Sequence, residues 1–149
     1  MAGIESGKIH KLPSWYTSLI KSQFDKLEEN LTHRKTIAQI YSKNLNPKII
    51  SKKIAETILK STNLRFPIFL ENREDLIKYL KTKSIYISDI WYDAPIAPKR
   101  YLSQTDYKNQ CPNSELASSV ILNLPTHKKV CEKDAEVISH YINQWLKSQ

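Results

Sequence analysis

The stretch QCPNSELASSVILNLPTHKKV, Gln110–Val130, predicts a short helix that passes directly into a strand. Pro112 fits the first turn of this helix, which runs through Val120, because a proline there removes only an N–H that has no helical partner. The residues ILNL that follow alternate as in a brief strand, and Pro125 ends it because proline cannot donate a ladder hydrogen bond. The stretch therefore indicates a fold that mixes helices and strands.

Upstream of this stretch, the chain predicts a strand, a helix and a second strand in succession. NLRFPIFLE, Asn63–Glu71, has the composition of a strand, and Pro67 places it at an edge or a bulge. Asn72 then caps a helix over residues 73–83, where apolar residues recur at helical spacing. SIYIS, Ser84–Ser88, predicts the second strand.

Apolar residues also recur three and four positions apart near both ends of the chain. At the beginning they predict one long helix over residues 12–45, which the motif NLNP ends. At the end they predict a helix over Glu132–Lys147, and residues 49–59 suggest a short helix or an irregular segment. The long helix exceeds what a small core needs, so we expect its outer face or one end to contact something else.

This order of elements predicts an α+β fold with two layers, in which a short, mainly antiparallel sheet carries helices on one face. We divide the chain into an N-terminal tail, residues 1–11, and one domain, residues 12–149. Within the domain, the long helix occupies residues 12–45 and the α+β part occupies residues 48–149. A chain of 149 residues has room for one such core.

Composition excludes several classes of protein. Both glycines, Gly3 and Gly7, lie at the N-terminus, so a Walker loop, a dinucleotide-binding loop and a serine-hydrolase elbow, which all need glycine, are excluded. No apolar run is long enough to cross a bilayer, and MAGIESGKIHK has no apolar signal core. We therefore expect a cytoplasmic protein with no membrane partner, and Cys111 and Cys131 fit such a reducing compartment.

The net charge of +8 raises the question of nucleic acid as a partner, because lysine and arginine bind phosphates. Lysine greatly outnumbers arginine, however, and the lysines are scattered along the chain in short clusters that lie far apart. This distribution is typical of a composition bias and does not favour nucleic acid as a partner.

The same elements in the same order resemble the C-terminal small domain of the DegT/DnrJ/StrS-type aminotransferases, which use pyridoxal phosphate (PLP) to aminate sugar nucleotides. SQFDKLEENLTHRKTIAQIYSKNL is similar to the long helix of that family, and LRFPIFLENREDLIKYLKTKSIYIS resembles its Phe-Pro strand, helix and following strand. WYDAPIAP resembles its tyrosine-proline substrate loop, and CPNSELASSVILNLPTHKKV is similar to its Cys-Pro helix and Leu-Pro terminus. The match covers nearly the whole chain.

The resemblance implies the small domain of a fold-type-I PLP enzyme. The complete enzyme would transfer an amino group from glutamate to a keto-sugar nucleotide, as in polysaccharide biosynthesis. In that family the lysine that binds PLP belongs to a large N-terminal domain, which we do not find in this sequence. We therefore expect a truncated enzyme that is inactive alone, with no catalytic residue and with no PLP bound to this chain by itself.

The resemblance and the long helix together suggest partners. We expect the apolar face of this helix to bind a large aminotransferase domain or a second copy of the chain, and we expect Trp15, Tyr16 and Phe24 in the core or in such a contact. Two other interpretations stay open. The chain is a non-catalytic subunit, or it is a small basic module that binds a partner protein, a sugar nucleotide or nucleic acid.

The resemblance also points to candidate site residues. The Gly-x-Asn-x-Arg motif of the family falls on Gly7, Ile9 and Lys11, so Lys11 is the candidate contact to PLP, without the bidentate fork of arginine. The aromatic and cationic residues of the loop WYDAPIAPKRY are the candidates for binding the sugar nucleotide: Trp91, Tyr92, Lys99, Arg100 and Tyr101. Aromatic faces stack on bases and cations pair with a diphosphate. The alternative is that the aromatic rings pack the loop against the core and the cations face water.

Cysteine and histidine predict no further chemistry. Cys111 and His127 lack an orienting third group, so we expect a small buried thiol and a surface imidazole rather than a nucleophile and its base. Together with Cys131 and His140 they also lack the closely spaced pair of ligands that a metal site needs. The sequence therefore predicts no metal site.

Overall fold

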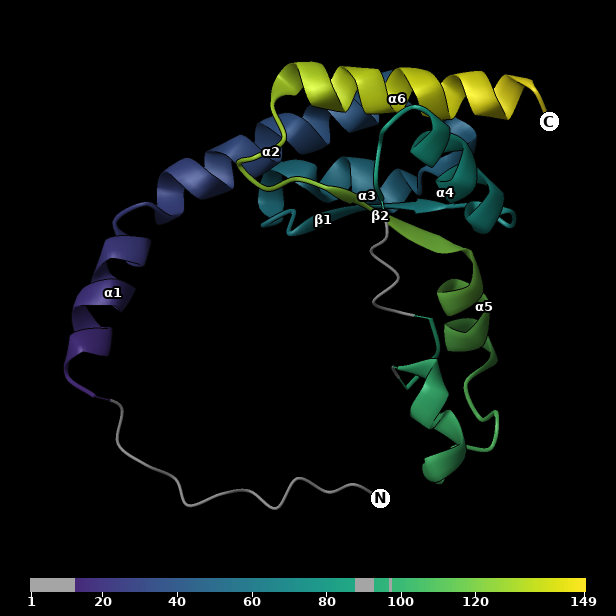
Figure 1. Cartoon of the computed structure of the whole chain (residues 1–149), viewed down its shortest axis with the longest axis horizontal. Helices are drawn as coiled ribbons and strands as arrows, with labels where there is room; N and C mark the ends of the chain where they lie inside the picture. Colours follow the sequence, from purple (N-terminus) through teal and green to yellow (C-terminus); the bar gives the residue numbers. More distant parts are fainter. Residues whose placement is uncertain (1–12, 88–92, 97) are drawn as a thin grey trace.

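The computed structural model describes residues 13–87, 93–96 and 98–149 (Figure 1). Its elements in chain order are α1 (Trp15–Phe24), α2 (Leu27–Asn44), η1 (Pro47–Ile49), α3 (Lys52–Thr57), η2 (Ile58–Lys60), β1 (Arg65–Phe69), α4 (Arg73–Thr82), η3 (Lys99–Gln104), α5 (Pro112–Val120), β2 (Ile121–Pro125) and α6 (Glu132–Lys147). The α+β class is confirmed, and so are the helix and strand of the stretch 110–130 and the last helix. The predicted tail, residues 1–11, lies outside the described residues. Within the described ranges, the helices are too short or too polar to span a membrane.

The sheet is an antiparallel ribbon of β1 and β2, in which Pro67 lies opposite Asn123. The N–H of Leu70 donates to the carbonyl of Val120 at 2.8 Å, and hydrogen-bonded pairs alternate with unbonded pairs along such a ribbon. Counting back from residue 70 places Pro67 at an unbonded pair, where no ladder donor is needed. The strand therefore accepts its proline without a bulge.

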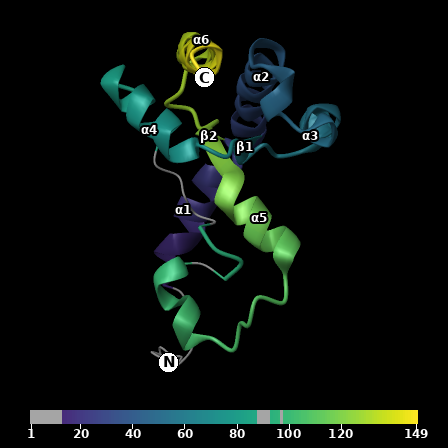
Figure 2. The same cartoon turned by 90° about the vertical axis from the view of Figure 1, so that its right-hand side faces the viewer.

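One face of the ribbon forms the floor of the core. Its four inward side chains are almost fully buried, namely Phe66, Ile68, Leu122 and Leu124. The helices α2, α4 and α6 lie on the same side of the ribbon in both views (Figures 1 and 2). The helices contribute further buried side chains to the same cluster, among them Ile37, Tyr41, Leu76, Leu80, Ala135 and Ile142. The alternation that predicted the strands thus provides the apolar face against which the helices pack.

A network of hydrogen bonds around the buried Thr126 joins α2 to the ends of the strands. The Nη1 atom of Arg34 donates to the carbonyl of Leu64 at 3.0 Å and to the hydroxyl of Thr126 at 3.1 Å. The Thr126 hydroxyl in turn donates to the carbonyl of Asn63 at 2.6 Å. Because Thr126 is fully buried, these bonds satisfy polar groups that would otherwise destabilise the core.

The prediction of one continuous helix over residues 12–45 is wrong. The helix is interrupted between Phe24 and Leu27, where the backbone of Lys26 has φ −99° and ψ 3°. The Lys26 N–H donates to the carbonyl of Gln23, three residues back, so the ladder of bonds to the fourth residue back is broken. Of the two parts, α2 contributes to the core, whereas α1 has no buried residue and extends away from the other helices (Figure 1).

The predicted strand over residues 84–88 is also wrong for residues 84–87, and Ser88 lies outside the described residues. Ser84 adopts a left-handed conformation with φ 61°. The N–H of Ser84 donates to the carbonyl of Lys81, and the N–H of Ile85 donates to that of Leu80, which is the Schellman pattern at a helix C-terminus. The backbone donor of Ile85 therefore caps α4 and is not available to a sheet.

Candidate functional site

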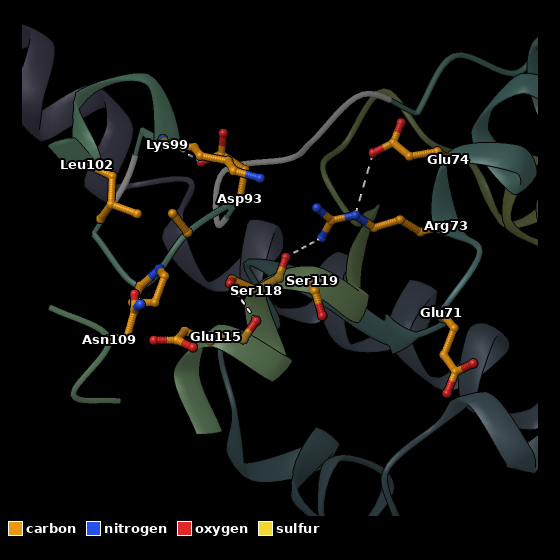
Figure 3. A pocket seen from close by; sticks show the side chains of 12 residues that line it. Glu71, Arg73, Glu74, Asp93, Lys99, Leu102, Asn109, Glu115, Ser118 and Ser119 are labelled. Atoms are coloured by element: carbon orange, nitrogen blue, oxygen red, sulfur yellow. Dashed lines mark hydrogen bonds and ion pairs between the residues drawn. The ribbon is translucent and has the colours of Figure 1, made fainter. Parts of the chain in front are cut away.

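The loop that follows α4 borders an open cleft of about 370 Å³ (Figure 3). Residues at the start of α4 and along α5 form one side of the cleft, and the segments around residues 93–102 and 109 form the other. The described residues that line it are Glu71, Arg73, Glu74, Asp93, Ala94, Pro95, Lys99, Leu102, Asn109, Glu115, Ser118 and Ser119. We refer to it as the Arg73 cleft.

Arg73 holds the C-terminal end of α5 in place. Its Nη1 atom donates to the carbonyl of Ser118 at 2.5 Å and to that of Ile121 at 2.8 Å, and its Nε atom lies 3.6 Å from Oε1 of Glu74 (Figure 3). The residue is buried, so these bonds satisfy a charge in a poorly solvated place. They also satisfy carbonyls at the end of α5 that have no partner within the helix. The hydrogen bonds of Arg73 therefore hold the α5 side of the cleft in place.

Tyr107 holds the other end of α5. Its hydroxyl donates to Oε1 of Glu115 at 2.6 Å and accepts from the backbone N–H of Cys111 at 3.2 Å. Desolvation, and next the hydrogen bond to Glu115, raise the pKa of Tyr107 above its usual value. A tyrosine hydroxyl is neutral at neutral pH, so it can donate to the Glu115 carboxylate. Arg73 and Tyr107 together clamp α5 at both ends.

The charge of the cleft is opposite in sign to that of the whole chain. Among its described lining residues, four are acidic and two are basic: Glu71, Glu74, Asp93 and Glu115 against Arg73 and Lys99. Arg73 is already bonded to two carbonyls and to Glu74, and the carboxylates repel an anion. The cleft therefore does not fit the phosphate of PLP, and we assign no step through PLP to these residues.

The structure describes three of the predicted site residues, and one of these three lines the cleft. Lys99 lines the cleft, and its backbone N–H donates to Asp93 at 3.1 Å. Arg100 and Tyr101 are exposed on η3 outside the lining, with the guanidinium 4.9 Å from the centre of the tyrosine ring. Trp91, Tyr92 and Lys11 lie outside the described residues.

Sequence reasoning missed the residue that organises the cleft, Arg73. A signal was present, because a cation in the first turn of a helix is unfavourable next to the positive end of the dipole unless it has another partner. The expectation that Cys111 is buried is also wrong, because its position at the start of α5 leaves it exposed. Both Cys111 and Cys131 are free thiols, and His127 is exposed as expected. The described residues form no group of three potential metal ligands.

Comparison with models of protein families matches residues 3–143 of the chain to the DegT/DnrJ/EryC1/StrS aminotransferase family. The matched range covers nearly all of the 149 residues and includes α2, the ribbon and every element that borders the Arg73 cleft. No curated protein matches the sequence.

Proposed function

Because the chain belongs to the DegT/DnrJ/EryC1/StrS aminotransferase family, we propose that it serves as the C-terminal, substrate-contacting domain of a sugar-nucleotide aminotransferase. Members of this family generally depend on PLP, which supplies the chemistry of amino transfer when it is bound. In this proposal, glutamate donates the amino group and a keto-sugar nucleotide accepts it. The loop that carries Trp91, Tyr92, Lys99, Arg100 and Tyr101 contacts the sugar nucleotide.

The proposal needs a second domain that carries the PLP-binding lysine, whether joined to this chain or separate from it. The Arg73 cleft does not fit the phosphate of PLP, and the candidate contact Lys11 supplies only a point charge. The domain described here therefore shapes the substrate site, and it is inactive without the lysine-bearing domain.

The observation that carries this proposal is the exposed apolar face of α1. No residue of this helix is buried. Its large apolar side chains are between 45% and 66% exposed, namely Trp15, Leu19, Ile20 and Phe24. The opposite face carries Ser18 and Lys21, as a solvent-facing surface does. A contiguous apolar stripe of this kind is typical of a surface that another protein domain covers.

The lysine-bearing domain is the occupant that we propose for this face. The exposed stripe continues through Leu27 at the start of α2, and the same helix buries Ile37, Ala38 and Tyr41 in the core. A domain seated on α1 would therefore be connected through α2 directly to the ribbon. A second copy of the chain is the competing occupant.

Association with a separately produced lysine-bearing domain of this family tests the proposal, with analytical ultracentrifugation and glutamate-dependent amino transfer as the two measurements. We expect no turnover by the chain alone and turnover by the mixture. The variant Leu19→Ser/Phe24→Ser should weaken the association at least about 100-fold, because two apolar side chains leave the interface. The variant Ser18→Ala/Lys21→Ala, on the opposite face, is the matched control and should bind normally.

Two results would contradict the proposal. A lysine-linked PLP absorbance in the purified chain would show that no second domain is needed for the cofactor. A stable dimer of the chain that Leu19→Ser/Phe24→Ser dissociates would show that a second copy covers α1.

A further inference from the structure

The turn that joins η2 to β1 holds two exposed leucines close together. The side-chain amide of Asn63 donates to the carbonyls of Ile58 at 2.8 Å and Ser61 at 3.0 Å, and the residue is buried. Asn63 has φ 48°, a left-handed conformation that asparagine accepts more readily than most residues. Because the bond between Asn63 and Ile58 closes the turn, Leu59 and Leu64, which follow these two residues, lie near each other.

Hydrogen bonds to the core anchor this turn. The carbonyl of Leu64 accepts from Arg34 at 3.0 Å and from the hydroxyl of Thr126 at 3.1 Å, and the same hydroxyl donates to the carbonyl of Asn63. The two leucine side chains nevertheless face solvent, with 65% of Leu59 and 63% of Leu64 exposed. Because the domain buries neither of them, their apolar surface contributes little to its stability and is available to another molecule.

Exposed lysines lie on the same segment. Residues 47–64, which we call the 47–64 surface, carry four exposed cations and one exposed anion: Lys48, Lys52, Lys53, Lys60 and Glu56. With the described part of the chain, none of the four ammonium groups forms an ion pair. Figure 2 shows α3 on the outer side of α2, away from α4 and α6. One side of the molecule therefore presents unpaired cations together with two leucines.

We propose that the 47–64 surface binds an anionic lipid bilayer, with Leu59 and Leu64 in the interfacial region and the lysines at the lipid phosphates. Lysines beside exposed apolar side chains bind such bilayers in two ways, by attraction to the anionic headgroups and by burial of apolar surface. Lysine suits this contact because its apolar stem lies along the interface while the ammonium group stays in water.

Three other occupants fit this surface less well. A second copy of the chain would bring the same cations together across a two-fold interface, where they repel. Nucleic acid offers phosphates and bases, but the segment has no aromatic side chain on which a base could stack. An acidic protein would need an apolar hollow that receives both leucines, whereas the headgroups of a bilayer rearrange around them.

This inference goes beyond the proposed function, because binding to a bilayer needs neither PLP nor a second domain and uses no residue of α1. It also departs from the expectation of no membrane partner. That expectation rested on the lack of a long apolar run, and binding at the interface requires no such run.

Cosedimentation of the full chain with lipid vesicles tests the inference. Vesicles of equal amounts of phosphatidylglycerol and phosphatidylcholine present an anionic surface, and vesicles of phosphatidylcholine alone present a neutral one. We expect binding to the anionic vesicles to be at least about tenfold stronger. This binding should weaken as salt is added, because salt screens the lysines.

Two variants of the 47–64 surface separate its apolar and charged parts. Leu59→Ser should weaken binding to the anionic vesicles about fivefold, because less apolar surface enters the interface. Lys53→Gln/Lys60→Gln should weaken it about 20-fold, at roughly fivefold for each lysine. All three positions are exposed, so both variants should fold normally, which circular dichroism checks.

Matched controls change the same residue types elsewhere on the chain. Leu116→Ser is the control for Leu59→Ser, because Leu116 is also 65% exposed and lies on α5. Lys108→Gln/Lys129→Gln removes the same charge from two exposed positions outside the 47–64 surface. Both controls should bind the anionic vesicles almost as well as the natural protein.

The variant Leu19→Ser/Phe24→Ser, which alters α1, should keep its vesicle binding. Loss of binding in this variant but not in Leu59→Ser would place the contact on α1 and overturn the inference. Equal binding to the neutral vesicles, or unchanged binding in either variant of the 47–64 surface, would also overturn it. Absence of binding to the anionic vesicles would overturn it too, and would leave an acidic protein as the occupant.

Discussion

At the scale of single residues, Tyr41 joins α2 to the ribbon and makes the stability of the protein depend on pH. Its ring lies 5.4 Å from that of Phe66, and its hydroxyl donates to the carbonyl of Pro125 at 3.1 Å. Burial raises the pKa of Tyr41 far above the value near 10 of an unfolded tyrosine. The neutral phenol therefore stabilises the fold fully below about pH 10, and this contribution is lost as the pH rises further.

We expect Tyr41→Phe to lower the free energy of unfolding by about 1 kcal/mol at neutral pH, because the Pro125 carbonyl loses its donor. Above about pH 10 the difference between the two proteins should narrow, because phenylalanine has no proton to lose. Urea unfolding at neutral and alkaline pH measures both effects. Tyr86→Phe, at a position that is 75% exposed, is the control. A difference that stays constant with pH would show that Tyr41 does not control the alkaline loss of stability.

At the scale of elements, the end of α4 depends on a residue in an unfavourable conformation. Ser84 has φ 61°, a region in which residues other than glycine are strained by about 1 kcal/mol or more. We expect Ser84→Gly to raise the free energy of unfolding by about 0.5–1 kcal/mol, after the greater freedom of glycine in the unfolded chain is included. Chemical denaturation measures the change. Ser84→Ala should be no more stable than the natural protein, and a loss of stability in Ser84→Gly would argue against the Schellman cap.

At the scale of the whole molecule, the net charge of +8 should produce only weak, salt-sensitive binding to DNA. The Arg73 cleft is acidic, and its described lining residues include only two cations, Arg73 and Lys99. Fluorescence anisotropy with a labelled DNA duplex should show an affinity that falls about tenfold or more between roughly 50 mM and 200 mM salt. Tight binding that survives the higher salt concentration would instead establish nucleic acid as a partner.

The candidate site was only partly predictable, and Lys99 and Arg73 show why. Lys99 belongs to a loop whose local motif resembles that of the family, so adjacent residues were enough to make it a candidate, and it lines the cleft. Arg73 bonds to carbonyls that lie 45 and 48 residues further along the chain. A pattern within one helix carries no information on partners at that distance.

Local chemistry was enough to predict α5, β2 and α6, because proline, alternation and helical spacing restrict the backbone within a few residues. The order of these motifs was enough to indicate the family. Three features depend on the folded chain: the interruption at Lys26, the cap at Ser84 that replaces a strand, and the acidic cleft in a basic protein. The physical reason is that each hydrogen-bond donor has more than one possible acceptor, and the folded chain decides which acceptor it takes. The N–H groups of Lys26 and Ile85 bond to carbonyls three and five residues back in place of the helical and sheet partners that the pattern predicted, and Arg73 bonds to carbonyls 45 and 48 residues away.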